Sequence, residues 1–234
     1  MMNQTQDPGN VSHPYPMTAL IHGRFSGGFG WIAYPDEFMR RSSTALVHDG
    51  RVWVIDPVYT TGIDAEIEAL GTIAGIILTL GHHDRDAIWF AERYGVPLYI
   101  PGNLIAAPRG GPAVRVAGQI PHSPLQLVPC GGRGALAWFQ ECAIWWPEHR
   151  LLITGDTLGT AGYFAAANAV GAHPFFRLSP PVSLLRLPVS RLYPGHGRSV
   201  IGDGVSEAVA TAISTARSNL VAGWVQAFRY IQGR

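Results

Sequence analysis

The chain contains no lysine and few charged residues of any kind. All 17 residues in the lysine-plus-arginine count are arginines, which excludes chemistry that needs a lysine amine, such as Schiff-base formation or a phosphate-loop lysine. Charged residues make up 14% of the chain, whereas roughly a quarter is usual for soluble domains. With a formal net charge of +1, the protein has no overall field that would attract nucleic acid or an anionic membrane. We therefore expect neither as a partner.

Cysteines and long apolar segments are also scarce. The two cysteines, Cys130 and Cys142, cannot form a disulfide scaffold or a four-cysteine zinc site. One bridge between them is an option, but the burial habits of cysteine favour two buried free thiols. No uninterrupted apolar run approaches the ~18 residues of a membrane span. The first ten residues lack the basic start and the apolar stretch of a secretory signal, so we expect a cytoplasmic location.

Apolar side chains and turn-forming residues are abundant instead. Hydrophobic residues make up 47% of the chain, enough to offset the entropy lost on folding and to build a large core. The 28 glycines and 18 prolines favour many short elements over a helical bundle. Residues 1–16 are polar and contain proline, which predicts a flexible arm. Residues 17–234 show no break in composition and predict a single domain of two α+β halves, packed sheet to sheet.

The first half of the chain predicts a hairpin followed by a crossover unit. Residues 45–48 and 51–55 flank Asp49-Gly50, a strong hairpin-turn signal. The apolar run 73–79 predicts a buried strand, Asp84 is suited to cap a helix over 85–94, and a strand should follow at 97–100. Further strands are expected at residues 113–116, 125–128, 135–139, 143–146, 151–154 and 191–193, and amphipathic helices within 206–231.

Metal-ligating residue types follow three of these predicted strands. They are His82, His83 and Asp84 after the first, Asp156 after the second and His196 after the third. Carboxyl ends of strands gather ligands in α/β sheets, and imidazole with carboxylate suits zinc, manganese or iron. Taken singly, the first group is also compatible with a helix cap beside exposed histidines, and the third with a tight turn. Their joint occurrence favours a site.

These segments resemble the sequence blocks of the metallo-β-lactamase superfamily. The run Thr79–Arg85 is similar to the family's Thr-His-x-His-x-Asp-His motif, Thr154-Gly155-Asp156 to its Thr-Gly-Asp, and Pro194–Gly197 to its Pro-Gly-His-Gly. The early Val54–Pro57 also matches the end of the family's opening strands. The resemblance runs from about residue 43 to 200. It implies an αββα sandwich whose metals lie at one edge, between the two sheets.

The departures from the family pattern concern the metal ligands. Leu80 and Arg85 stand where the motif has histidines, and neither can coordinate a metal. Gly131, or its neighbour Cys130, stands at the family's middle histidine. The ligands that the resemblance retains are His82, Asp84, Asp156 and His196. An ordinary two-metal centre is therefore not expected.

Two interpretations of the depleted site remain open. In one, a single divalent ion (zinc most of all, or manganese or iron) is held by Asp84, Asp156 and His196. His82 then ligates the ion or orients water, and Arg85 binds an oxyanion or a substrate carboxylate. In the other, no metal binds and Arg85 pairs with Asp84 or Asp156. His83 is expected at the surface or behind the ligands.

The corresponding functions belong to different classes. The first is a metal-dependent hydrolase with Asp84, Arg85 and His82 as catalytic residues, acting on an ester, amide or thioester of a small apolar molecule. The second is a metal-free pseudoenzyme or small-molecule binding protein. An aromatic stretch would suit an apolar substrate, although plain loop packing explains it equally well: Tyr163, Phe164, His173, Phe175 and Phe176. The apolar stripe of the last helices predicts a homodimer, or else docking on the domain's own sheet.

Overall fold

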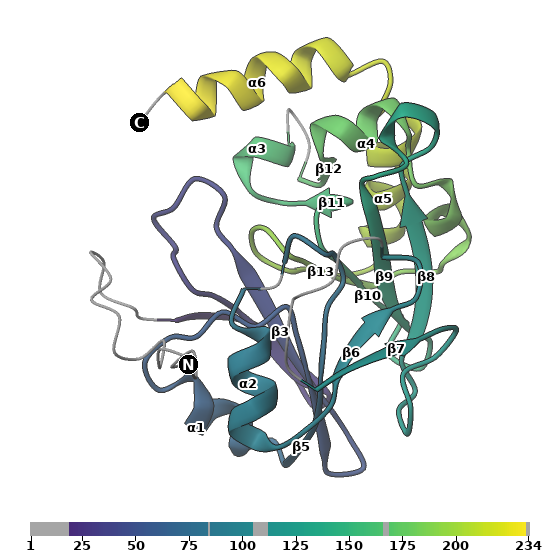
Figure 1. The fold of residues 1–234 in the computed structure, drawn as a ribbon. Helices are drawn as coiled ribbons and strands as arrows, with labels where there is room; N and C mark the ends of the chain where they lie inside the picture. Colours follow the sequence, from purple (N-terminus) through teal and green to yellow (C-terminus); the bar gives the residue numbers. More distant parts are fainter. Residues whose placement is uncertain (1–18, 84, 105–111, 166–168, 233–234) are drawn as a thin grey trace, which may run out of the picture.

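Two mixed sheets face each other in the computed structural model, which describes residues 19–83, 85–104, 112–165 and 169–232 (Figure 1). The arm predicted at residues 1–16 lies outside this range. The first sheet has the order β1-β2-β3-β4-β5-β6-β7. Its strands are β1 (Leu20–Phe25), β2 (Gly28–Ile32), β3 (Ser42–His48), β4 (Arg51–Ile55), β5 (Thr72–Ile77), β6 (Leu98–Pro101) and β7 (Ala113–Val116).

The predicted hairpin and crossover are both confirmed in this sheet. Strands β3 and β4 pair antiparallel, and the turn residues Asp49 and Gly50 have φ of 50° and 70°, as a two-residue type I′ turn requires. Strands β4, β5, β6 and β7 then run parallel. Helices α1 (Ile63–Glu68) and α2 (Ala87–Tyr94) make the first two crossovers.

The second sheet has five strands in the order β14-β13-β10-β9-β8. They are β8 (Gln126–Gly131), β9 (Gln140–Trp146), β10 (Leu151–Thr154), β13 (Arg191–Pro194) and β14 (Val200–Ile201). The strand predicted at 135–139 is wrong, because a 3₁₀ turn, η2 (Gly134–Leu136), occupies that position. Gly134 enters this turn with φ of 59°, a conformation that glycine adopts without a steric penalty.

The remaining elements follow β10. They are the small ladder β11 (Leu158–Gly159) and β12 (Gly171–Ala172), the helices α3 (Gly162–Ala165), α4 (Pro174–Leu178), η3 (Val182–Arg186), α5 (Val205–Ser214) and α6 (Leu220–Gln232). Helix α5 packs on the outer side of the second sheet, whereas α3, α4 and α6 lie beyond the edge of the sandwich (Figure 1). Arg177 joins several of them, since its buried guanidinium donates to the carbonyl oxygens of Phe164, Ala172 and Asn219.

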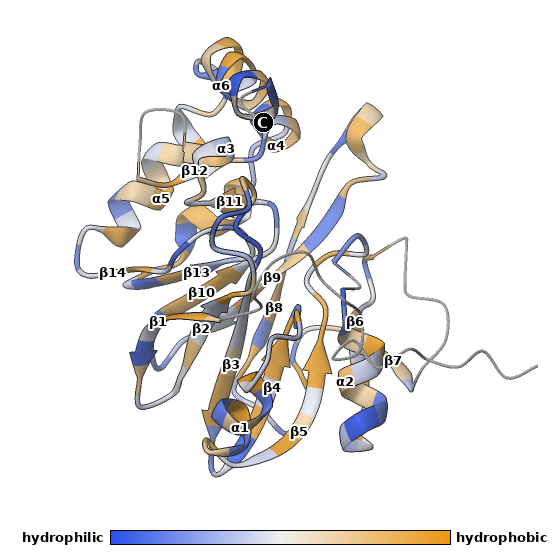
Figure 2. Cartoon of the chain, turned by 90° about the vertical axis from the view of Figure 1, so that its left-hand side faces the viewer, coloured by the Kyte–Doolittle hydropathy of each residue, from blue (hydrophilic) through white to orange (hydrophobic). Residues whose placement is uncertain are grey.

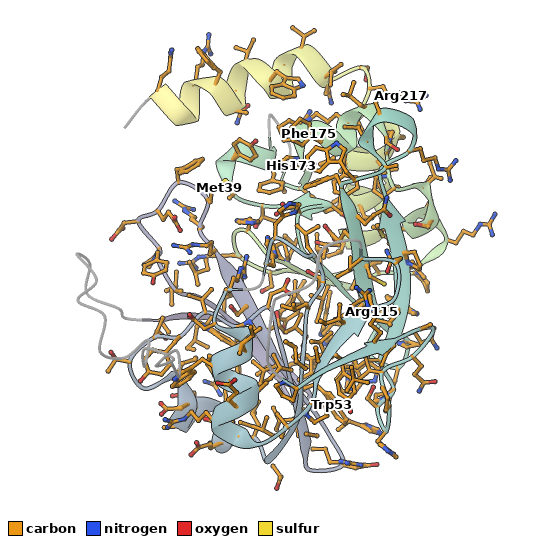
Figure 3. All side chains as sticks on the ribbon, viewed as in Figure 1. Met39, Trp53, Arg115, His173, Phe175 and Arg217 are labelled. Atoms are coloured by element: carbon orange, nitrogen blue, oxygen red, sulfur yellow. The ribbon has the colours of Figure 1, made fainter. Side chains whose placement is uncertain are left out.

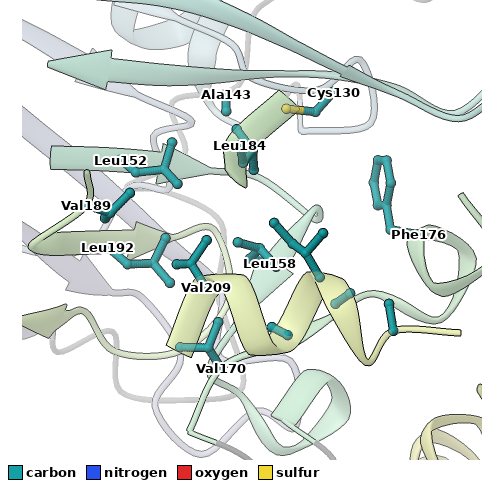
Figure 4. Close-up of a cluster of buried hydrophobic side chains, with 14 of the residues drawn as sticks. Cys130, Ala143, Leu152, Leu158, Val170, Phe176, Leu184, Val189, Leu192 and Val209 are labelled. Atoms are coloured by element: carbon teal, nitrogen blue, oxygen red, sulfur yellow. The ribbon is translucent and has the colours of Figure 1, made fainter. Parts of the chain in front are cut away.

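Three apolar clusters mark the contacts between four layers. Val52 and Val54 of β4 face α1 and α2, whereas Trp53 and Ile55 of the same strand pack between the sheets. The outer face of the second sheet packs on α5, including Leu152 and Val209 (Figure 4). Alternate residues of one strand therefore enter different clusters, as the period of two of a strand requires. The predicted αββα sandwich is confirmed.

The two cysteines lie on opposite faces of the β8–β9 pair and do not form a disulfide. Cys130 lies in the cluster with α5 and Cys142 in the cluster between the sheets. Both are buried free thiols, as expected, and they point to opposite sides of one sheet.

The last helix leaves an apolar face in solvent. Figure 2 shows apolar residues along α6, and the exposed ones are Val221, Trp224, Val225 and Phe228. In α5, by contrast, the apolar residues Val209 and Ile213 are buried against the second sheet. Dimerisation through the exposed part stays a prediction, which light scattering tests. Among the described residues, no helix has the length and apolarity to cross a membrane.

Candidate metal centre

Three loops that follow strands meet at one edge of the sandwich. His83 follows β5 of the first sheet, while Asp156 and His196 follow β10 and β13 of the second. Strands β10 and β13 are parallel neighbours with Thr154 opposite Pro194, so their loops leave the sheet side by side. The start of β3 in the first sheet is joined to the loop after β13, because the N–H of Ser42 donates to the carbonyl of Gly195 at 2.8 Å.

The side chains of His83, Asp156 and His196 converge there. Nε2 of His83 lies 3.1 Å from Oδ1 of Asp156, and Nε2 of His196 lies 3.0 Å from the same oxygen. The two Nε2 atoms are 3.3 Å apart. All three residues are buried, with at most 9% of their surface exposed. Two imidazoles and one carboxylate thus present three ligand atoms to one point.

The other ring nitrogen of each histidine is already committed. Nδ1 of His83 donates to Oδ2 of Asp56 at 3.0 Å, and Nδ1 of His196 donates to the carbonyl of Met39 at 2.9 Å. The carbonyl of Met39 can only accept, so the proton of neutral His196 is on Nδ1 and its Nε2 carries a lone pair. Asp56 favours the same tautomer in His83. Hydrogen bonds of this kind orient metal-ligating histidines.

Asp56 is itself fixed by the strand that leads to His83. The carboxylate, which is 2% exposed, accepts from the backbone N–H of Thr79 at 2.8 Å and from the hydroxyl of the same residue. It lies directly after β4, with φ of 45°. The ends of β4 and β5 therefore set the position of the imidazole of His83 together.

The cluster of three ligand atoms favours a positive charge at its centre. Burial and Arg85 act to lower the pKa of His83, but the charge of Asp156 and the hydrogen bonds to both aspartates outweigh them and raise it to about 9. Burial would raise the pKa of Asp156, yet the two histidines hold it well below its usual range. Burial lowers the pKa of His196. Either a metal ion or a proton on His83 can supply the positive charge that this arrangement requires.

Arg85 places a permanent cation next to the cluster. Its Nη2 lies 3.5 Å from Nε2 of His83 and donates to the carbonyl of Gly195 at 3.1 Å. Its Nη1 donates to the carbonyls of Ser42 and Asp56 at 2.6 and 3.0 Å. The guanidinium thus holds three segments together at the site. The expected partners were Asp84, which lies outside the described residues, and Asp156; the contacts seen are backbone carbonyls and His83.

Glu141 supports the site from the second sheet. It lies in β9 with no exposed surface, and its carboxylate accepts from the backbone N–H groups of Gly155, Asp156 and Thr157. Burial first, and then the charge of Asp156, raise the pKa of Glu141 to about 7, against these hydrogen bonds. Glu141 was not predicted from the sequence, although a carboxylate inside the apolar run of β9 was a signal for it.

His82 is not part of the cluster. Its side chain is exposed, and its ring lies 6.2 Å from that of Trp138 and 6.0 Å from that of Phe139. The family motif gave His82 as a ligand and left His83 at the surface or behind the ligands, whereas in the structure His83 joins the cluster and His82 is exposed. Two contacts explain this: the N–H of His83 closes a turn on the carbonyl of Leu80, and the ring of His83 reaches the carboxylate of Asp56. Leu80 itself is buried in the apolar core.

Aromatic residues continue outward from the cluster. The ring of Phe164 stacks on His196 at 5.3 Å, and His173 lies 5.7 Å from Phe164 and 5.3 Å from Phe175. His173 and Phe175 lie at the start of α4, beneath α6 in Figure 3, and the ring of Phe175 is 5.8 Å from that of Trp224 in α6. Trp138, which is 50% exposed, lies at the outer end of this aromatic group.

A search of solved structures identifies the architecture. A DIM-1 metallo-β-lactamase exposed to ceftazidime superposes with a TM-score of 0.61 at 16% identity, covering 85% of this chain and 97% of that one. A metallo-β-lactamase from Pontibacter korlensis gives 0.61 at 15%, covering 84% and 99%. The chain has the metallo-β-lactamase fold.

Another solved structure with this fold is FIM-1 from Pseudomonas aeruginosa, in its mono-zinc form. It superposes with a TM-score of 0.57 at 14% identity and covers 87% of this chain and 98% of that one. No protein-family model and no curated protein matches the chain. At these identities the comparison establishes the fold, so the chemistry has to be argued from the residues present.

Proposed function

We propose that the protein is a hydrolase that uses one divalent metal ion to cleave an ester, amide or thioester bond in a small apolar molecule. The observation that carries this proposal is the convergence of three acceptor atoms, Nε2 of His83, Nε2 of His196 and Oδ1 of Asp156, within 3.0–3.3 Å of one another. Two histidines and one carboxylate form the ligand set of one class of catalytic zinc site.

The spacing of these atoms suits a metal ion. Zinc–ligand bonds of about 2.0–2.1 Å in a tetrahedron put neighbouring ligand atoms about 3.3 Å apart, close to the distances of the cluster. Three protein ligands leave a fourth position for water or substrate. Among the described residues, neither buried cysteine belongs to the group of ligand atoms, which favours zinc, manganese or iron over softer metals.

The chain's own residues supply orientation and charge around the ion. When bound, zinc would polarise the scissile carbonyl and lower the pKa of a water molecule. Asp56 and the carbonyl of Met39 hold the imidazoles of His83 and His196 in the ligating tautomer. The guanidinium of Arg85, fixed by carbonyls of three segments, can stabilise a developing oxyanion or bind a substrate carboxylate. The aromatic group around His173 and Phe175 supports an apolar substrate.

Metal analysis with paired histidine variants tests the proposal. Protein purified without chelator should contain close to one equivalent of metal, and His83→Ala should lose it. His82→Ala is the matched control, because it changes the neighbouring histidine outside the cluster and should keep the metal. The metal-loaded protein should hydrolyse at least one substrate of an ester, lactone, thioester and amide panel, and chelation should abolish that activity.

The second candidate is a metal-free small-molecule binding protein on the same fold. It is favoured by Arg85, whose Nη2 lies 3.5 Å from Nε2 of His83 and brings positive charge to the acceptor cluster without a metal. No metal uptake even after reconstitution, together with binding of apolar ligands by the parent protein, would replace the hydrolase with this function.

A further inference from the structure

Glu141 binds the loop that carries Asp156 through three consecutive backbone amides. Oε1 accepts from the N–H of Gly155 at 2.8 Å, and Oε2 accepts from those of Asp156 at 2.7 Å and Thr157 at 2.6 Å. When Glu141 is ionised, these bonds are charge-assisted and stronger than those between neutral groups. Because one carboxylate takes all three, the direction of each N–H in this loop depends on it.

The same loop has little freedom to settle elsewhere. A Cβ atom on Gly155 would lie 2.6 Å from the hydroxyl of Thr79 and 3.3 Å from Oε2 of Glu141, so the backbone is packed closely against both residues. The side chain of Asp156 leaves this backbone and reaches His83 and His196 at 3.1 and 3.0 Å. A shift of the loop would therefore move Oδ1 away from both histidines.

The backbone around Glu141 also reaches the other ligand loop. Glu141 forms an antiparallel bridge with Leu80, and the N–H of Cys142 donates to the carbonyl of Thr79 at 2.8 Å. His83 follows directly and is tied back to Leu80 by the bond from its own N–H. Residues 141 and 142 thus lie between the loop of His83 in one sheet and the loop of Asp156 in the other.

We propose that Glu141 is a positioning residue of the metal centre, which sets the distance of Asp156 from the two histidines without touching the ion. This inference rests on the proposed function, since it concerns the affinity for metal. Its structural part, the control of the 155–157 backbone by the carboxylate, can be measured in the metal-free protein.

Three variants test the assignment. Glu141→Gln keeps the size of the side chain, but its amide group presents N–H bonds toward N–H donors. Glu141→Asp keeps the charge and shortens the reach. Glu148→Gln removes an exposed glutamate beyond the end of the same strand and serves as the control. The measurements are the dissociation constant for Zn²⁺ or Co²⁺ by chelator competition, the Co²⁺ absorption spectrum, and hydrogen exchange of the amides of 155–157.

We expect Glu141→Gln to weaken metal binding at least tenfold, to change the Co²⁺ spectrum and to speed exchange of the three amides. Glu141→Asp should fold and show a smaller change in the same direction, and Glu148→Gln should match the parent. If Glu141→Gln does not fold, Glu141→Asp decides. Parental metal affinity and spectrum in a folded Glu141 variant would overturn the inference. A parent that binds no metal would instead remove the proposed function, and parental amide exchange in the variants would then overturn the structural part.

Discussion

Arg85 should weaken metal binding while it stabilises the fold, and substitutions can separate these effects. Its Nη2 lies 3.5 Å from Nε2 of His83, so its charge acts on any ion held by that nitrogen. Two unit charges about 4 Å apart repel by about 4 kcal/mol at an effective dielectric constant of about 20. Water around this half-buried side chain screens part of this repulsion. We expect Arg85→Gln to tighten Zn²⁺ or Co²⁺ binding at least tenfold, which corresponds to about 1.4 kcal/mol.

The same substitution should destabilise the metal-free protein. The guanidinium donates to the carbonyls of Ser42, Asp56 and Gly195 at 2.6, 3.0 and 3.1 Å. A hydrogen bond from a charged donor contributes about 1.5–3 kcal/mol. The shorter glutamine side chain can replace one of the three hydrogen bonds, and water can hydrogen-bond to the carbonyl groups that it leaves unpaired. We expect the free energy of unfolding to fall by about 2–4 kcal/mol.

Arg85→Lys is the matched control, because it keeps the charge and loses the planar fork. It should lose stability without gaining metal affinity. The assays are chelator competition at neutral pH for the dissociation constant, and urea unfolding of chelator-treated protein for stability. A folded Arg85→Gln protein with unchanged or weaker metal binding would refute the view that this charge shares the metal's surroundings, and undiminished stability would refute the bridging role.

Three further predictions concern the supports of the site and the sheets. Asp56→Asn should weaken metal binding by about 10–100-fold in chelator competition, because the acceptor that fixes the tautomer of His83 is lost, whereas the exposed Asp203→Asn should change nothing. Burial, and then Arg198, lower the pKa of His22 from 6.5 to about 4. Between these two pH values the unfolded chain takes up a proton on His22 and the folded protein does not, so the free energy of unfolding should fall by up to about 3 kcal/mol as the pH decreases. Urea unfolding over this range should show a flatter slope in His22→Gln, and an unchanged slope would contradict the argument. Gly28→Ala should lower the unfolding free energy by more than about 1 kcal/mol, since a Cβ at φ 140° would lie 2.0 Å from a backbone oxygen in β3; calorimetry that finds parental stability would disprove this.

The acid sensitivity assigned to His22 follows from its contacts. Its Nδ1 accepts from the N–H of Ser199 at 3.1 Å and its Nε2 lies 3.0 Å from the hydroxyl of Ser42. A second proton on the ring would break the bond from Ser199 and place a charge in a site that is 8% exposed. This contact holds the segment that follows His196 to β1.

The sequence by itself determined the layers of this protein and the segments that meet at its edge. The Asp49-Gly50 hairpin, the apolar run that became β5 and most of the later strands were readable because they depend on local turn chemistry and on side-chain periodicity. Parallel strands then bring their carboxyl ends to one edge whatever the loops contain. For that reason Asp156 and His196 were placed correctly in one cluster.

The tertiary structure alone decided which side chains enter the site. His82 and His83 are neighbours in a loop, where the direction of a side chain has no fixed period; a turn onto Leu80 and the distant carboxylate of Asp56 turn His83 inward. Glu141 acts on amides 14–16 residues away along the chain, through a hydrogen bond that no local pattern encodes. Where a strand begins and ends depends largely on neighbouring residues, whereas the direction of a loop side chain is set by partners that only folding brings within hydrogen-bond distance.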